Sequence, residues 1–275
     1  MRTKPVATIM TLAALILFGG CIEESPLISD KELIVVWAFL YAGEPVTDIR
    51  LTSTVPLADT SEASPINDAQ ITLIKDGQRY ECEPSPGDSG YYHYEGTDLT
   101  IDTGDEFTIE IVRGEQFVTA KTSVPEKPIS VALSSSVMEV PDFSNRESMW
   151  EWRNSENRDI TISWENTDGS WYYVTMENIE DNPVAISSWI HERLRRFIFP
   201  PINDDTYRIG LPLITHLGLH RVNVYRVNQE YVDLYESREQ DSRDLNEPLT
   251  NIEGGLGVFA AFNSDGDTLN VVMMN

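Results

Sequence analysis

Side chains that could carry acid–base or nucleophilic chemistry are present, but they form no catalytic pattern in the sequence. His93, His216 and His220 lie far apart along the chain, and no Gly-x-Ser-x-Gly turn accompanies them. The pair His191-Glu192 begins like the helix of a zinc protease, yet the fourth residue after His191 is Arg195 instead of a second histidine. We therefore predict no catalytic residues and expect solvated or core-edge histidines. A serine hydrolase built from residues without a signature stays open as an alternative.

Metal and cofactor sites are not predicted either. Asn263, Asp265 and Asp267 offer oxygens to Ca²⁺, but the downstream Glu of an EF-hand loop is missing, so we interpret residues 263–267 as a hairpin turn. The glycines within residues 254–257 would suit a nucleotide only between a strand and a helix. Because a strand is predicted to follow them, we expect these glycines to permit positive φ or close backbone approach.

The remaining candidates are one thiol and two indoles. Cys82 lies two residues after Tyr80, on the same face of a predicted strand, which is typical of a small buried hydrophobe and not of a catalytic thiol. Trp150 and Trp152 would share one face of an extended segment. Such a pair could form a platform for sugars, peptides or a protein, but burial between sheets is the interpretation we favour.

Composition excludes several classes of protein. The chain has 275 residues with 45 Asp and Glu against 20 Lys and Arg, a net charge of −25, which repels nucleic acid and anionic lipid surfaces. Hydrophobic residues make up 41% of the chain, enough for globular cores. Two cysteines allow neither a disulfide framework nor a thiolate metal cluster.

The N-terminus carries an export signal. Basic residues precede an apolar run over residues 6–18, which is shorter than the roughly 20 residues that span a bilayer. Residues 17–21 read Leu-Phe-Gly-Gly-Cys and resemble a bacterial lipobox, in which Cys21 is acylated and becomes the mature N-terminus. We predict a signal peptide over residues 1–20 and a lipidated tether over residues 21–30. A plain signal peptide with a coincidental cysteine is the alternative.

Residues 31–126 are predicted to form an N-terminal β-sandwich, immunoglobulin-like or transthyretin-like. Residues 33–41 are all apolar, as in a strand buried on both faces, and residues 49–55 alternate with period two. Asp76-Gly77 predicts a tight hairpin, and residues 113–115 predict a second turn between strands. No helical stretch interrupts this pattern.

Residues 127–275 are predicted to form a fibronectin type III-like sandwich with a helical insertion. Residues 160–164 and 171–176 are interpreted as the two strands of a hairpin, and a helix is predicted near residues 228–242. Residues 188–199 are predicted to form a short basic helix. The C-terminus is predicted to be a hairpin turning at residues 263–267.

The order of these elements, together with the segment Asn-Ile-Glu-Gly-Gly-Leu-Gly-Val-Phe at residues 251–259, resembles one family. This is the group of Bacteroidota lipoproteins known as domain of unknown function 4249. The resemblance implies a surface accessory role beside TonB-dependent outer-membrane receptors, in capturing or gating a ligand. It implies no enzymatic activity.

The functional prediction follows from the export signal and this resemblance. Glu23 and Glu24, just after Cys21, resemble a signal for the outer face of the outer membrane. We expect an outer-membrane lipoprotein facing the extracellular side, anchored by its lipid. It is predicted to be a non-catalytic binding or accessory module that uses no cofactor and binds no nucleic acid, with a TonB-dependent receptor as its expected partner. The alternatives are an extracellular glycan or peptide hydrolase with unsignalled carboxylates and a passive structural protein of the envelope.

Overall fold

Strands with alternating burial build most of the described chain. The structure is a computed structural model that describes residues 32–55, 62–143, 146–155, 158–186, 195–239 and 250–274. The described residues from Leu33 onward belong to one compact unit, and the fold below is that of this unit. The predicted signal peptide, the tether and Cys21 lie outside the described residues.

The mainly β fold class predicted from the sequence is confirmed. None of the helices in the described ranges is long and apolar enough to cross a membrane. The helices are α2 (Arg146–Trp152), α3 (Gln229–Glu239) and the 3-10 helix η2 (Leu211–Leu213). The strands are β1 (Ile34–Tyr41), β2 (Asp48–Ser53), β3 (Gln70–Lys75), β4 (Gln78–Pro84), β5 (Tyr91–His93), β6 (Glu106–Arg113), β7 (Gln116–Ser123), β8 (Ala132–Leu133), β9 (Val137–Val140), β10 (Ile160–Ser163), β11 (Trp171–Asn178), β12 (Arg196–Ile198), β13 (Thr206–Ile209), β14 (Gly218–Val227) and β15 (Leu256–Met273).

The first core lies between two groups of strands. One group has the order β15–β1–β2–β5 and the other β4–β3–β6–β7, and they join where β4 pairs with β5. In β1, Ile34, Val36, Ala38 and Leu40 point into this core, while the alternate residues are half-buried on the other face. Period-two alternation thus gives β1 two covered faces.

The second core lies between a sheet of order β12–β11–β14–β15–β9 and a smaller sheet of order β13–β10–β8. Ile160 and Ile162 of β10 meet Val222 and Val224 of β14 in one cluster of buried side chains. This layered packing of two sheets buries one face of each.

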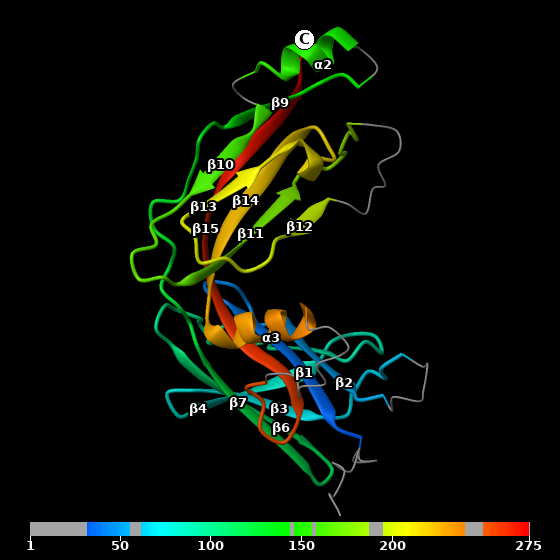
Figure 1. Ribbon diagram of the computed structural model, residues 1–275. Coiled ribbons are helices and arrows are strands. Elements are labelled where there is room, and N and C mark those ends of the chain that lie inside the picture. Colours follow the sequence, from blue (N-terminus) through cyan, green and yellow to red (C-terminus); the bar gives the residue numbers. More distant parts are fainter. Residues whose placement is uncertain are drawn as a thin grey trace, which may run out of the picture. The chain divides into compact units, whose positions relative to one another are not determined.

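The predicted C-terminal hairpin is wrong, because β15 runs without a turn from Leu256 to Met273 (Figure 1). Residues 262–271 pair continuously with β14 in antiparallel register. Gly266 is part of this pairing and lies opposite Asn223. A Cβ added at Gly266 would lie 2.5 Å from the Val222 carbonyl oxygen. Here Gly allows close packing of strands, and the long-range pairing overrides the local turn preference of Asn, Asp and Gly.

Two further expectations for the second half are corrected. β10 and β11 do not form a hairpin, since β10 pairs with β8 and β13 while β11 pairs with β12 and β14. Within residues 188–199, Arg196–Ile198 is strand β12 and not a helix, because its backbone pairs with β11. Residues 188–194 of that predicted helix lie outside the described chain.

Several local predictions are confirmed. Asp76 and Gly77 form the β3–β4 turn with φ of 50° and 78°, as a tight hairpin requires. The turn at residues 113–115 joins β6 to β7. The helix predicted near residues 228–242 is α3, although residues 240–249 lie outside the described part.

The first half of β15 pairs in parallel with β1, from Val35 opposite Leu256 to Tyr41 opposite Phe262. Gly257 has a φ of +107°, and a Cβ there would lie 1.9 Å from the Val36 carbonyl oxygen. Gly254 also has positive φ, and Gly255 packs closely on the backbone of β1. The expectation of positive φ and close approach in residues 254–257 is therefore confirmed.

The predicted boundary between residues 126 and 127 stays a prediction. What the structure adds is that Ile252, Phe259 and Ala261 belong to the first core, whereas Leu269 and Val271 belong to the second. One strand therefore contributes to both.

We expect Gly257→Ala to lower the free energy of unfolding by at least about 2 kcal/mol, because the new methyl group would overlap the β1 backbone at an unfavourable φ. Urea denaturation would measure this. Gly104→Ala is the matched control, since Gly104 has a φ of +83° but open space around it. Equal losses in the two variants would show that close approach at Gly257 is unimportant.

Candidate functional site

Aromatic side chains gather on the face of β1 that points away from the first core. We call them the aromatic cluster. Rings from four strands and α3 contact one another here: Tyr173 stacks on Tyr225 with 4.7 Å between centroids, and Tyr231 of α3 meets Phe262 edge-on at 5.0 Å. The cluster consists of Trp37, Phe39, Tyr41, Trp171, Tyr173, Tyr225, Tyr231 and Phe262.

Burial disfavours ionisation of the phenols at the centre of this cluster. Burial raises the pKa of Tyr173 and of Tyr41 well above the usual value, and the neighbouring phenols and, for Tyr41, the Asp48 carboxylate add to the effect. These hydroxyls are therefore poor proton donors at neutral pH, and their rings act in packing.

A groove opens beside the cluster, between the outer face of β1, β2 and β5 and the side of α3. It has a volume of about 480 Å³, within the usual range of roughly 300–1,000 Å³ for small-ligand sites. We call it the aromatic groove. It is lined by Trp37, Phe39, Asp48, Arg50, Thr52, Ala63, Tyr91, Tyr231, Leu234 and Tyr235.

The strand register places aromatic and charged side chains next to one another on the floor of the groove. Trp37 lies opposite Arg50, and Arg50 lies opposite Tyr91, so these three form one row across β1, β2 and β5. In the next row Phe39 lies opposite Asp48. Directly opposite residues on neighbouring strands contact each other through their side chains, so the floor alternates flat apolar surfaces with hydrogen-bonding groups.

The two charged groups of the groove differ in environment. Burial raises the pKa of Asp48, while attraction to Arg196 and a hydrogen bond from Tyr41 partly offset this. The Arg50 guanidinium lies over the Tyr91 ring, 5.5 Å from its centroid, in a cation–π contact. Arg50 and Tyr91 are both exposed, so this pair meets solvent at the groove.

A second groove of about 520 Å³ lies near the start of α3 and is more polar. Thr122 donates a hydrogen bond of 2.6 Å to Glu230, and Asn228 donates one of 2.6 Å to the Ser123 carbonyl oxygen. These two hydrogen bonds hold the start of α3 against the end of β7. The lining combines Lys121 with several carboxylates and has few rings for a ligand to pack against.

Among the described residues, neither His93 nor Cys82 belongs to a candidate nucleophilic site in either groove. Ser85 Oγ lies 3.1 Å from Nδ1 of His93, but Glu95, 3.7 Å from the other ring nitrogen, is 70% exposed. Neither of the two grooves is lined by these residues. Cys82 is buried, as predicted, and burial raises the pKa of its thiol to about 12, which disfavours the thiolate.

His216 and His220 are buried, contrary to the expectation of solvated or core-edge side chains. His220 Nδ1 lies 3.0 Å from the Gly218 carbonyl oxygen, which can only accept, so Nδ1 carries the proton. The Asn178 side-chain amide lies 3.4 Å from Nε2 and donates to it. This geometry suits a neutral ring, and burial lowers the pKa of His220 accordingly.

The residues considered for Ca²⁺ do not converge. Asn263 donates to Thr103 Oγ1 and to the Pro125 carbonyl oxygen, at 2.8 and 3.0 Å, while Asp265 pairs with Lys127 at 3.2 Å. No group of three or more His, Cys, Asp or Glu side chains arranged to hold a metal occurs within the described ranges. These side chains instead join β15 to the chain around residues 103–127.

Trp150 and Trp152 lie on helix α2 and not on an extended segment. Trp150 is 68% exposed, so the favoured burial between sheets is wrong for it. Trp152 is half-buried, and its Nε1 donates to the Glu139 carbonyl oxygen at 3.0 Å. The two indoles therefore do not form one platform.

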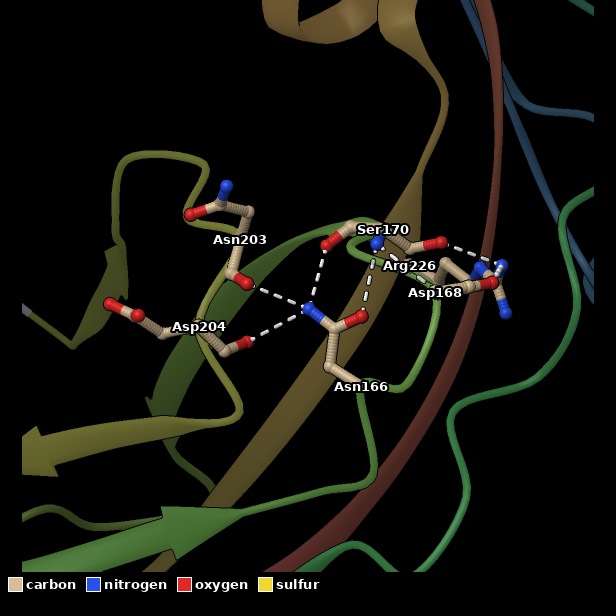
Figure 2. Close-up of polar contacts among 6 residues, drawn as sticks. All are labelled: Asn166, Asp168, Ser170, Asn203, Asp204 and Arg226. Carbon is tan, nitrogen blue, oxygen red and sulfur yellow. Dashed lines mark hydrogen bonds and ion pairs between the residues drawn. The ribbon is translucent and has the colours of Figure 1, made fainter.

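A polar network organises the loop between β10 and β11 (Figure 2). The Asn166 side-chain amide donates to the carbonyl oxygens of Ser170 and Asn203, at 3.0 and 2.7 Å. Asp168 pairs with Arg226 at 2.5 Å, and hydrogen bonds from Ser170 together with this pair lower its pKa. Since each polar group binds a loop or strand neighbour, we assign this network a structural role.

The residues of the aromatic groove were not predicted as a site from the sequence. Trp37 and Phe39 were interpreted only as parts of a buried strand, and Tyr231 and Tyr235 only as the apolar side of a helix. The available signal was the alternation in residues 33–41, which places Trp37, Phe39 and Tyr41 on one face. The positions of Asp48 and Arg50 beside these rings depend on how β2 is aligned with β1, and the sequence does not determine that register.

The buried His220 should make stability depend on pH. Because its pKa is lowered in the folded state, stability is greatest above the usual value of 6.5 and falls as the pH drops below it, by up to about 1.4 kcal/mol per pH unit. We expect the difference in free energy of unfolding between pH 8 and pH 5.5, measured with urea, to be smaller in His220→Gln than in the wild type. An unchanged difference would contradict this assignment.

Comparison with solved structures returns proteins of immunoglobulin and fibronectin type at low identity. A structure titled "Cytokine receptor complex - Crystal form 1A" is 12% identical, covers 86% of this chain and 95% of its own, and has a TM-score of 0.25. The FN1-FN3 domains of chicken CNTN1 are 13% identical, with coverage of 72% and 60% and a TM-score of 0.24. At such TM-scores these likenesses carry no argument about function.

No curated protein matches the chain. The family described as "Domain of unknown function (DUF4249)" matches residues 22–267, which is most of the sequence. The chain therefore belongs to this family of unknown function, as its resemblance at residues 251–259 predicted.

Proposed function

We propose that this protein is a lipid-anchored, non-catalytic binding module of the bacterial cell envelope that takes up its ligand in the aromatic groove. The observation that carries the proposal is the row of Trp37, Arg50 and Tyr91 beside the α3 side chains, in a groove of about 480 Å³. Aromatic surfaces with a few polar groups are typical of ligand sites.

The make-up of the groove supports binding over hydrolysis. Asp48 is the only carboxylate among its described lining residues, whereas glycoside hydrolysis generally uses a pair of carboxylates about 5–10 Å apart. The buried thiol of Cys82 is unsuited to nucleophilic attack. A passive spacer, the other alternative, would have no need of a groove lined with rings.

The anchor and the location rest on the sequence. Acyl chains on Cys21, at about 0.8 kcal/mol per buried methylene, would hold the protein at a membrane without a spanning helix. The acidic pair Glu23 and Glu24 supports export to the outer face of the outer membrane. The expected partner there is a TonB-dependent receptor, to which the bound ligand would be delivered.

Lipidation and surface exposure can be tested together. We expect radiolabelled palmitate to mark the wild-type protein but not Cys21→Ala, because acylation needs the thiol. Protease added to intact cells should remove the wild-type protein, as measured by immunoblotting. A periplasmic protein serves as the protection control, and protection of this protein to the same extent would overturn the surface location.

The accessory role predicts a stable complex. Affinity purification from detergent-solubilised outer membranes should enrich a TonB-dependent receptor, identified by mass spectrometry, with the tagged wild type. Cys21→Ala, which lacks the lipid anchor, should not recover it. Recovery of no TonB-dependent receptor with the wild type would show that the accessory role is wrong.

A further inference from the structure

We infer that the aromatic groove binds a neutral oligosaccharide, whose sugar rings stack on its aromatic side chains and whose hydroxyl groups bond to Asp48 and Arg50. This inference rests on the proposed binding function and names the ligand class. Three features of the groove support it: the spacing of the rings, the presence of one cationic and one anionic side chain, and the absence of a free strand edge along the described floor.

The rings are spaced for a chain of sugars. Trp37 lies on β1 and Tyr91 on β5, and β2 runs between these two strands. Two strand spacings separate the residues by about 10 Å, which is more than the width of one sugar ring. The negative face of an aromatic ring attracts the polarised C–H groups on the flat side of a sugar. Tyr231 and Tyr235 of α3 add rings along the side of the groove.

The charges favour a ligand that is polar but neutral. Arg50 forms no ion pair with any other described residue, and its guanidinium, held over Tyr91, presents donors toward the groove. Asp48, two residues earlier on the same face, presents acceptor oxygens. Neighbouring hydroxyl groups of a sugar both donate and accept, so they can satisfy both side chains. An anionic ligand would meet Asp48 and a chain of net charge −25.

The described strands at the floor of the groove offer no free edge to an extended peptide. β1 lies between β15 and β2. On its other side β2 is bonded through Leu51, whose N–H donates to Gly90 O at 2.8 Å and whose carbonyl accepts from Ile66 at 3.0 Å. Extended peptides commonly bind by adding a strand to a free edge, so a site made only of side chains suits a sugar better.

The test uses the full-length lipoprotein in detergent and a panel of neutral hexasaccharides, including maltohexaose, cellohexaose and mannohexaose, measured by isothermal titration calorimetry. We expect at least one to bind, with an affinity that changes little between low and high salt because the ligand carries no charge. Tyr91→Ala and Arg50→Ala should each weaken this binding at least tenfold. Trp150→Ala removes an exposed indole outside the groove and should leave the affinity unchanged.

Two results would overturn the inference: no binding of any neutral hexasaccharide in the panel, or binding that Tyr91→Ala and Arg50→Ala leave intact. A peptide that bound in a Tyr91-dependent way while the sugars did not would also overturn it, but would leave the proposed binding function standing. Sugar binding without recovery of a TonB-dependent receptor would support the inference and remove the accessory role.

Discussion

Parallel hydrogen bonding between β1 and the first half of β15 ties the two cores to each other. β15 crosses from the first core, through Phe259 and Ala261, to the second, through Leu269 and Val271. That path requires a residue without a Cβ at position 257, because the Val36 carbonyl oxygen lies against Gly257. The arrangement of the two cores thus depends on a parallel contact between residues more than two hundred positions apart.

The same strand pair creates the candidate site. Since β1 is covered on one face by the first core, its other face is left to the aromatic cluster, and Tyr231 fixes α3 over it by edge contacts with Phe39 and Phe262. The groove is the part of this face that the helix leaves uncovered. Its floor is therefore rigid sheet and not loop, which reduces the ordering cost of binding.

Local sequence patterns predicted the elements well and their pairing poorly. The Asp76-Gly77 turn and α3 follow from backbone preference and helical spacing, and both are confirmed. The turn predicted at residues 263–267 fails because residues 262–271, which include it, pair with ten residues of β14, and this pairing outweighs the preference of Asn, Asp and Gly for turns. The groove was not foreseen for the same reason: Trp37, Arg50 and Tyr91 meet only through long-range register.

The environment of Asp48 indicates which kind of ligand the groove suits. Its raised pKa shows that burial makes the charged form costly, even with Arg196 and Tyr41 nearby. A purely apolar ligand would remove more water from this carboxylate and raise the cost further. A ligand with hydroxyl groups supplies hydrogen-bond donors in place of that water. Binding of such a ligand therefore stabilises the charged form of Asp48, and the charged carboxylate in turn strengthens binding.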